Sequence, residues 1–171
     1  LAASVAPAAA VPNLTKKEIE TIKNIIDDRI TFMCLSDADA LTASKQYLEE
    51  KQTYADKNGF SEQAKIIIDN LMATEIISHI YQIDAKDPEI KKFISPKVEK
   101  AAKWLDNHKK ESGISAYMYC TTAEAISSGL SFMSMTEIMS YGLKIKDYFD
   151  KAIETDSTLA FAYSGLAQWY Y

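Results

Sequence analysis

The stretch of sequence that decides the expected fold is residues 149–171, FDKAIETDSTLAFAYSGLAQWYY. Apolar residues at helical spacing flank a short polar break at residues 155–158, which predicts two helices joined by a tight turn. In the second helix a small residue such as Ala167 lets a neighbouring helix approach, while Tyr163 or Tyr170 fills the adjoining gap. The stretch therefore predicts closely packed, antiparallel helices.

These residues resemble the tetratricopeptide repeat (TPR). In that family the second helix of a repeat ends in a pattern like A-[IL]-E-x-D-P, and the next repeat begins with a helix like A-x-A-[WY]-x-x-L-[GA]-x-x-Y. Residues 152–156 match the first pattern, and Ser157 stands in place of its proline. The second pattern is matched at Ala160, Ala162, Tyr163, Leu166, Ala167 and Tyr170. The resemblance is specific over residues 143–171. It implies an all-α fold in which antiparallel helical hairpins stack as a TPR-like right-handed superhelix.

A fainter copy of the pattern lies upstream. Residues 116–119, followed by Ala123, align with residues 160–163, followed by Ala167, at an offset of 44 residues. A standard repeat of this family is about 34 residues long, so longer helices and turns are expected here. We therefore assign residues 96–171 to TPR-like repeats of which the last is incomplete, residues 14–95 to an N-terminal helical region and residues 1–13 to a leader.

The rest of the chain is also predicted to be helical. Five glycines and four prolines in 171 residues are too few for the many turns of a sandwich or barrel. Helix starts are predicted at capping residues and at prolines in the first helical position, and helix ends at glycines. The starts are Thr15 (with Glu18 in a capping box), Ser36, Ser61, Asp87-Pro88, Ser95-Pro96 and Ser115, and the ends are Gly59 and Gly113.

Two of these helices carry informative apolar patterns. Ile19, Ile22, Ile25, Ile26 and Ile30 recur at spacings of three and four, which predicts a buried face. The helix that begins at Ser61 is apolar on more than one side, so we expect it at the centre of the fold.

Charge and composition exclude several classes of function. The net charge is −5 and the only arginine is Arg29, which argues against nucleic-acid binding. Cys34 and Cys120 lie far apart, as do His79 and His108, so neither a disulfide, a metal site nor another cofactor is expected. No catalytic motif is found, and no apolar run approaches the ~20 residues that span a membrane.

The first ten residues, LAASVAPAAA, resemble the small-residue end of a secretory signal. A flexible leader has the same composition. Extracytoplasmic localisation (periplasmic, secreted or as a lipoprotein) and cytoplasmic localisation therefore both stay open.

The resemblance implies a non-enzymatic protein–protein interaction module, because TPR proteins bind partners mainly on the concave surface lined by the first helices of the repeats. The candidate partner-binding residues are Tyr117, Cys120 and Glu124 in the earlier copy and Phe161, Ser164 and Gln168 in the later one. The lysines and asparagines with which some TPR domains clamp a terminal carboxylate are not found at these positions. An aromatic-lined groove for an apolar or helical segment of a protein or peptide partner is expected instead.

Two alternatives remain. The first is an extracytoplasmic ligand-binding accessory subunit of a solute transporter, for which an enclosed apolar cavity is expected rather than an open groove. The second, and weaker, is an all-α enzyme. The three aromatic residues at positions 169–171 call for cover on several sides. We therefore expect either that the native chain continues or that a second subunit associates with the last helix.

Overall fold

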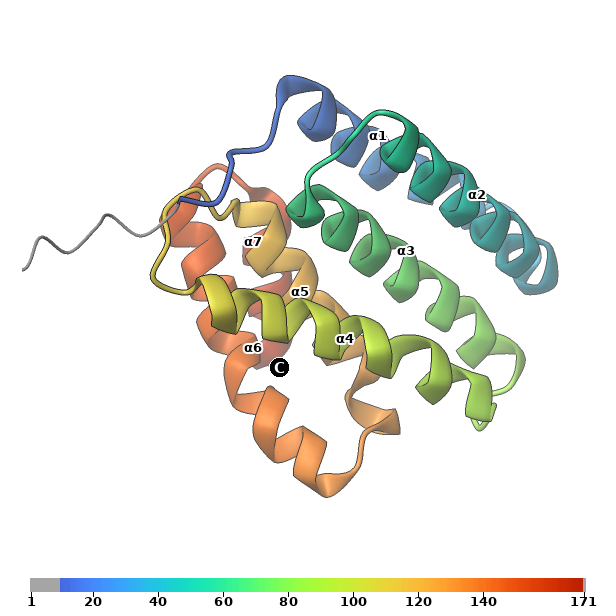
Figure 1. The fold of residues 1–171 in the computed structure, drawn as a ribbon. Helices are drawn as coiled ribbons and strands as arrows, with labels where there is room; N and C mark the ends of the chain where they lie inside the picture. The colour runs from blue at the N-terminus through green and yellow to red at the C-terminus, as the bar shows by residue number, and fades with distance from the viewer. Residues whose placement is uncertain (1–9, 171) are drawn as a thin grey trace, which may run out of the picture.

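The computed structural model describes residues 10–170, which fold into seven α-helices and one short 3-10 helix, with no strand among these residues (Figure 1). The all-α prediction is confirmed for this part of the chain. The leader predicted over residues 1–13 lies mostly outside the described residues. The elements are α1 (Lys16–Phe32), α2 (Asp37–Lys57), α3 (Glu62–Ile83), α4 (Pro88–His108), α5 (Ala116–Gly129), η1 (Leu130–Phe132), α6 (Met135–Thr155) and α7 (Ala160–Tyr170).

The helices follow a regular order of contacts. Each odd-numbered helix contacts the next odd-numbered one, so α1, α3, α5 and α7 form one row. Each even-numbered helix packs against the two odd-numbered helices that precede and follow it in the chain. In Figure 1 this order runs from α1 and α2 on one side of the molecule, through α3 and α4, to α6 and α7 on the other. All helices contribute to a single contiguous hydrophobic core.

The predicted helix boundaries are mostly confirmed, because local hydrogen bonds set them. At the start of α1 the Glu18 N–H donates to Thr15 Oγ1 (3.2 Å) and the Thr15 N–H donates to Glu18 Oε2 (2.6 Å), which is the expected capping box. The N-cap residues of α2, α4 and α5 are Ser36, Asp87 and Ser115. Each of their side chains accepts a hydrogen bond from a backbone N–H in the first turn of its helix.

The core is built around α3, as the sequence predicts. Most residues of α3 are buried, and so are most residues of α5, which packs against it, whereas the other helices bury one face. In α1 the expected buried face is only partly correct: Ile22 and Ile25 are fully buried, but Ile30 is 63% exposed. The buried face of α1 instead continues through Arg29 to Phe32, because the Arg29 side chain reaches an acidic partner on α3.

The second helix start predicted at Ser95-Pro96 is wrong, because α4 runs without a break from Pro88 to His108. Proline in a helix interior removes one backbone hydrogen bond, here to the carbonyl of Lys92. Both Lys92 and Pro96 are exposed, so water can hydrate that carbonyl and the helix continues. Position 96, at which the repeat region was predicted to begin, therefore lies inside α4.

The N-terminal segment is tied to the α4–α5 loop. The Val11 N–H donates to the Ser112 carbonyl at 3.0 Å. Gly113, with φ of 94°, lies so close that an added Cβ would be 2.0 Å from the Val11 carbonyl oxygen. The buried Gln63 side chain, at the start of α3, donates to the Gly113 carbonyl (3.3 Å) and accepts from the Ser115 N–H (2.6 Å).

The close approach between α6 and α7 differs in register from the prediction. The small residues on the packed face of α7 are Ala162, which is buried, and Gly165, which lies against the Phe149 ring. Ala167, Tyr163 and Tyr170 are all exposed, so they take no part in the contact between α6 and α7. The Phe149 side chain of α6 supplies the large residue of the pair, and Gly165 supplies the small one.

Candidate binding groove between α3, α5 and α7

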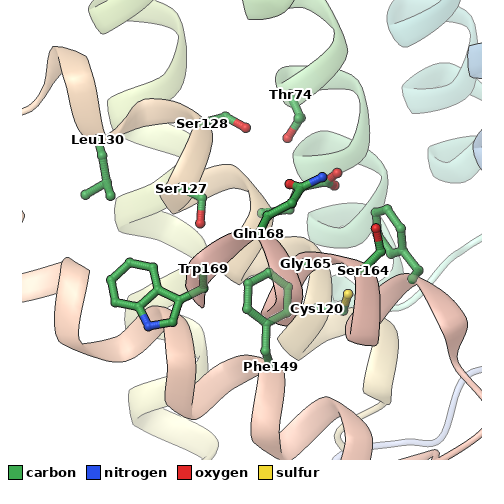
Figure 2. Close-up of a pocket in the computed structure, with 12 residues that line it drawn as sticks. Thr74, Cys120, Ser127, Ser128, Leu130, Phe149, Ser164, Gly165, Gln168 and Trp169 are labelled. Carbon is green, nitrogen blue, oxygen red and sulfur yellow. The ribbon is translucent and has the colours of Figure 1, made fainter. Parts of the chain in front are cut away.

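A cavity of about 430 Å³ opens on the row of odd-numbered helices (Figure 2). One side is formed by Thr74 of α3 and by residues of α5, and the other by Phe149 of α6 and by residues of α7. Figure 2 shows Thr74 and Ser128 on one side of this space and Phe149 and Trp169 on the other. The lining residues are Thr74, Cys120, Glu124, Ser127, Ser128, Leu130, Phe149, Phe161, Ser164, Gly165, Gln168 and Trp169.

Five of the six candidate residues from the sequence line this cavity. They are Cys120, Glu124, Phe161, Ser164 and Gln168. The sixth, Tyr117, does not line it. Tyr117 is half-buried at the start of α5, where burial and then the charges of Asp156 and Asp27 raise the pKa of its phenol. The structure therefore brings five of the six residues together.

Aromatic rings form the apolar part of the lining. They come from Phe149 of α6 and from Phe161 and Trp169 of α7. The absence of a side chain at Gly165 lets the Phe149 ring lie directly against α7, so this ring is held in place by packing. Phe149 and Trp169 were not among the candidate residues predicted from the sequence.

Neutral polar groups form most of the rest. Hydroxyl groups are contributed by Thr74, Ser127, Ser128 and Ser164, and an amide by Gln168. The Thr74 hydroxyl already donates to the Asn70 carbonyl of its own helix at 3.1 Å. The other groups can donate to or accept from the polar atoms of a bound molecule.

Cys120 is a poor nucleophile in this setting. Its side chain is fully buried and makes no disulfide. Burial, and then the nearby charge of Glu124, raise the pKa of the thiol well above its usual value. Because the thiolate is the reactive form, this cysteine acts as part of the wall of the cavity.

Glu124 belongs to a charged network that joins three helices. Arg29 Nε of α1 donates to Glu75 Oε2 of α3 at 3.0 Å, and Arg29 Nη1 lies 3.6 Å from Glu124 Oε2 of α5. The side chains of Arg29, Glu75 and Glu124 are 17%, 9% and 24% exposed. Burial raises the pKa of Glu124, with Glu75 adding to that shift and Arg29 opposing it.

The network extends to His79, one turn further along α3. His79 Nε2 lies 2.9 Å from Glu75 Oε1, and His79 Nδ1 lies 3.8 Å from Asp37 Oδ1 at the start of α2. The sequence analysis treated His79 as isolated and missed the whole network. The spacing of Glu75 and His79 by four residues was the one available signal, since such pairs meet on a helix surface.

A second cavity, of about 280 Å³, continues the first along α3 and α5. Thr74 and Ser128 line both cavities, so the two adjoin. The lining of the second includes Tyr81 and Phe132, whose rings meet edge to face with centroids 6.1 Å apart. We call the two cavities together the α3–α5–α7 groove. An elongated molecule fits such a groove better than a compact one.

Within residues 10–170 there is no group of three or more His, Cys, Asp or Glu side chains placed to hold a metal ion. None of the helices in this part of the chain is both long enough and apolar enough to cross a membrane.

Comparison of the chain with protein-family models, with curated proteins and with solved structures gives no significant match.

Proposed function

We propose that this chain is a non-enzymatic protein–protein interaction module that binds a segment of a partner protein in the α3–α5–α7 groove. In this proposal the helical hairpins stack as a TPR-like right-handed superhelix, and the odd-numbered helices line its concave face. The observation that carries the proposal is the gathering of Cys120, Glu124, Phe161, Ser164 and Gln168 around one cavity. These residues were chosen from the repeat pattern alone, as positions that face a partner.

The composition of the groove supports an extended or helical peptide segment as the occupant. Hydroxyl and amide groups offer hydrogen bonds to backbone and side-chain atoms, and the rings of Phe149, Phe161 and Trp169 offer apolar contact area. The packing of Phe149 against Gly165 fixes part of the surface before binding, which lowers the entropy cost of capture. The neutral state of Cys120 favours a binding role over nucleophilic catalysis.

A selection of peptides from a phage-displayed library tests the proposal. Ser164 lines the cavity and is exposed, so Ser164→Trp fills the groove without disturbing the core. Its neighbour Tyr163 is exposed and does not line the cavity, so Tyr163→Trp is a matched control. We expect selected peptides to bind the wild-type chain and Tyr163→Trp, and to lose at least about tenfold in affinity for Ser164→Trp. Equal binding to all three proteins would overturn the proposed groove.

The second candidate function is that of an extracytoplasmic accessory subunit that binds a small solute for a transporter. The volume of the main cavity, about 430 Å³, favours it, because small-molecule pockets usually measure about 300–1,000 Å³. Native mass spectrometry separates the two candidates. A co-purified small molecule that is retained by Tyr163→Trp and absent from Ser164→Trp would support the solute-binding function.

Localisation and self-association stay predictions. Of the ten residues that suggested export, 1–10, the first nine lie outside the described part of the chain. Self-association through the last helix is expected to bury its exposed aromatic side chains, of which Tyr163 and Tyr170 are the clearest. Sedimentation of the wild-type chain and of Tyr170→Glu measures this directly. A concentration-dependent dimer that Tyr170→Glu abolishes would support it, and a monomer at all concentrations would contradict it.

A further inference from the structure

The α3–α5–α7 groove carries one charged lining residue, Glu124. Every other residue that lines either of its two cavities is neutral, and no lysine, arginine or histidine is among them. A carboxylate that lines a cavity attracts a positively charged ligand group when no cationic side chain lines the same cavity.

The pairing of Glu124 inside the protein is incomplete. Two carboxylates, those of Glu75 and Glu124, share the single guanidinium of Arg29. Glu75 takes the hydrogen bond, at 3.0 Å, whereas the 3.6 Å separation leaves Glu124 without one. Glu124 Oε2 is buried and accepts no hydrogen bond from any described residue. Burial of a carboxylate in this state is costly. Because Oε2 is shielded from solvent beside Arg29, a ligand donor can relieve that cost only at the other carboxylate oxygen, Oε1.

Aromatic rings line the same cavity. The accessible rings are those of Phe161 and Trp169, since Phe149 is 2% exposed and lies against Gly165. Aromatic rings attract organic cations, and their area suits the aliphatic stem of a long side chain. A carboxylate and aromatic rings around one space are suited to an ammonium or guanidinium group on an apolar stem.

From this arrangement we propose that the groove recognises a lysine or arginine side chain of the partner segment, with Glu124 as its counter-charge and the aromatic cluster around its stem. This inference rests on the proposed function, since it names the residue type that a peptide partner presents. A purely apolar segment would instead leave Glu124 buried without a new partner.

The first test uses two small probes that differ only in the side-chain ammonium group. They are Nα-acetyl-lysine methylamide and Nα-acetyl-norleucine methylamide. Trp169 is the only tryptophan in the groove, so Trp104→Phe makes its fluorescence a specific readout. In this background we expect the lysine probe to bind about tenfold more tightly than the norleucine probe. Glu124→Gln should remove that preference, and Glu154→Gln, an exposed acidic residue of α6 outside the groove, should retain it.

A second pair of variants keeps the test decisive if Glu124→Gln does not fold. Ser128 lines both cavities, so Ser128→Lys places an internal ammonium in the groove, and Ser128→Met adds a neutral side chain with a similar stem. We expect Ser128→Lys to weaken binding of the lysine probe more than Ser128→Met does. The proposal is overturned if both probes bind equally, if neither binds, or if the preference survives Glu124→Gln.

The peptide selection described above is repeated on the Trp104→Phe protein and on its Glu124→Gln derivative to separate the two levels of the proposal. Groove-dependent peptides that are rich in lysine or arginine only when Glu124 is present support both. Groove-dependent peptides with no such enrichment keep the proposed function and overturn the inference. If binding of the lysine probe depends on Glu124 but no groove-dependent peptide is selected, the cation site is supported and the peptide-binding function is overturned.

Discussion

Gly165 of α7 lies directly against the ring of Phe149 of α6: a Cβ at Gly165 would be 2.3 Å from Phe149 Cε1. A second glycine within a helix, Gly142 of α6, has open space instead, and its nearest neighbour would be the Ile138 side chain at 3.9 Å. The two positions therefore separate the packing role of glycine from its effect on helix propensity.

Gly165→Ala is expected to destabilise the contact between α6 and α7. Overpacking costs about 1–3 kcal/mol and helix propensity gains about 1 kcal/mol, so the expected net loss is up to about 2 kcal/mol. Gly142→Ala has only the gain, so it should stabilise the protein by about 0.5–1 kcal/mol. Urea unfolding followed by circular dichroism measures both free energies, and Trp169 emission reports on α7. A stabilising effect of Gly165→Ala would contradict the observed packing.

Arg29→Met is expected to lower the free energy of unfolding by about 3 kcal/mol, as for other ion pairs that lose one buried partner. Glu124 then loses the charge that opposes the rise in its pKa. When the pKa of a carboxyl is raised in the folded state, its contribution to stability is complete below its unfolded pKa. That contribution is lost as the pH rises through its folded pKa. The loss in free energy of unfolding caused by Arg29→Met should therefore be larger at pH 7 than at pH 4.5.

The matched control for Arg29→Met is Lys23→Met, since Lys23 is an exposed cation on the same helix. Denaturant unfolding at the two pH values gives the comparison. Equal losses for both variants would show that the network of Arg29, Glu75 and Glu124 contributes nothing beyond surface charge.

Glu18→Gln is expected to destabilise the start of α1 by about 1–3 kcal/mol at pH 7, because hydrogen bonds to a charged acceptor are lost. Burial raises the pKa of Glu18, but hydrogen bonds from the N–H groups of Thr15 and Ser61, each 2.6 Å long, outweigh it and lower the pKa. The contribution of Glu18 is thus complete above its unfolded pKa and is lost as the pH falls through its folded pKa.

The difference in stability between the wild-type chain and Glu18→Gln should therefore shrink below about pH 4. Thermal unfolding over a range of pH values checks this, with Glu20→Gln as the control, since Glu20 is exposed on the same helix. A difference that stays constant down to pH 2.5 would contradict the role of the ionised carboxylate.

The two cysteines are expected to react at very different rates. Cys34 is exposed just after α1, whereas Cys120 is buried and its thiol pKa is raised by burial. Iodoacetamide should modify one thiol per chain in the native protein and the second only on unfolding. Mass spectrometry counts the modifications, and Cys34→Ser should resist alkylation in the folded state. Rapid double labelling of the native wild-type chain would argue against the packing of α5.

Features with local causes could be predicted from the sequence. The capping box of Thr15 and Glu18, the end of α2 next to Gly59, and the central position of α3 follow from near neighbours or from hydrophobic pattern. The helix end predicted at Gly113 is wrong, because α4 already ends at His108 and Gly113 instead lies against Val11. The continuity of α4 through Pro96 could not, because it depends on the exposure of that side of the helix in the folded protein.

The groove was predictable in part for the same reason. Cys120 and Ser164 could be placed at equivalent positions of a repeat, since spacing fixes which residues share a helix face. The contacts of Arg29 with Glu75 and Glu124 join residues far apart in the sequence, and no short-range pattern records them. The register of α7 was missed because Gly165 and Ala167 are both small, and only the position of the Phe149 ring distinguishes them.

The hydrogen bond between Val11 and Ser112 bears on how this protein unfolds. In an open stack of helical hairpins each unit contacts only its neighbours, so unfolding can start at either end and spread. Here Gln63 and Val11 fasten the beginning of the chain to the α4–α5 loop. The first hairpin cannot peel away while that loop stays in place. We therefore expect the start of α1 to unfold together with the α4–α5 loop rather than ahead of it.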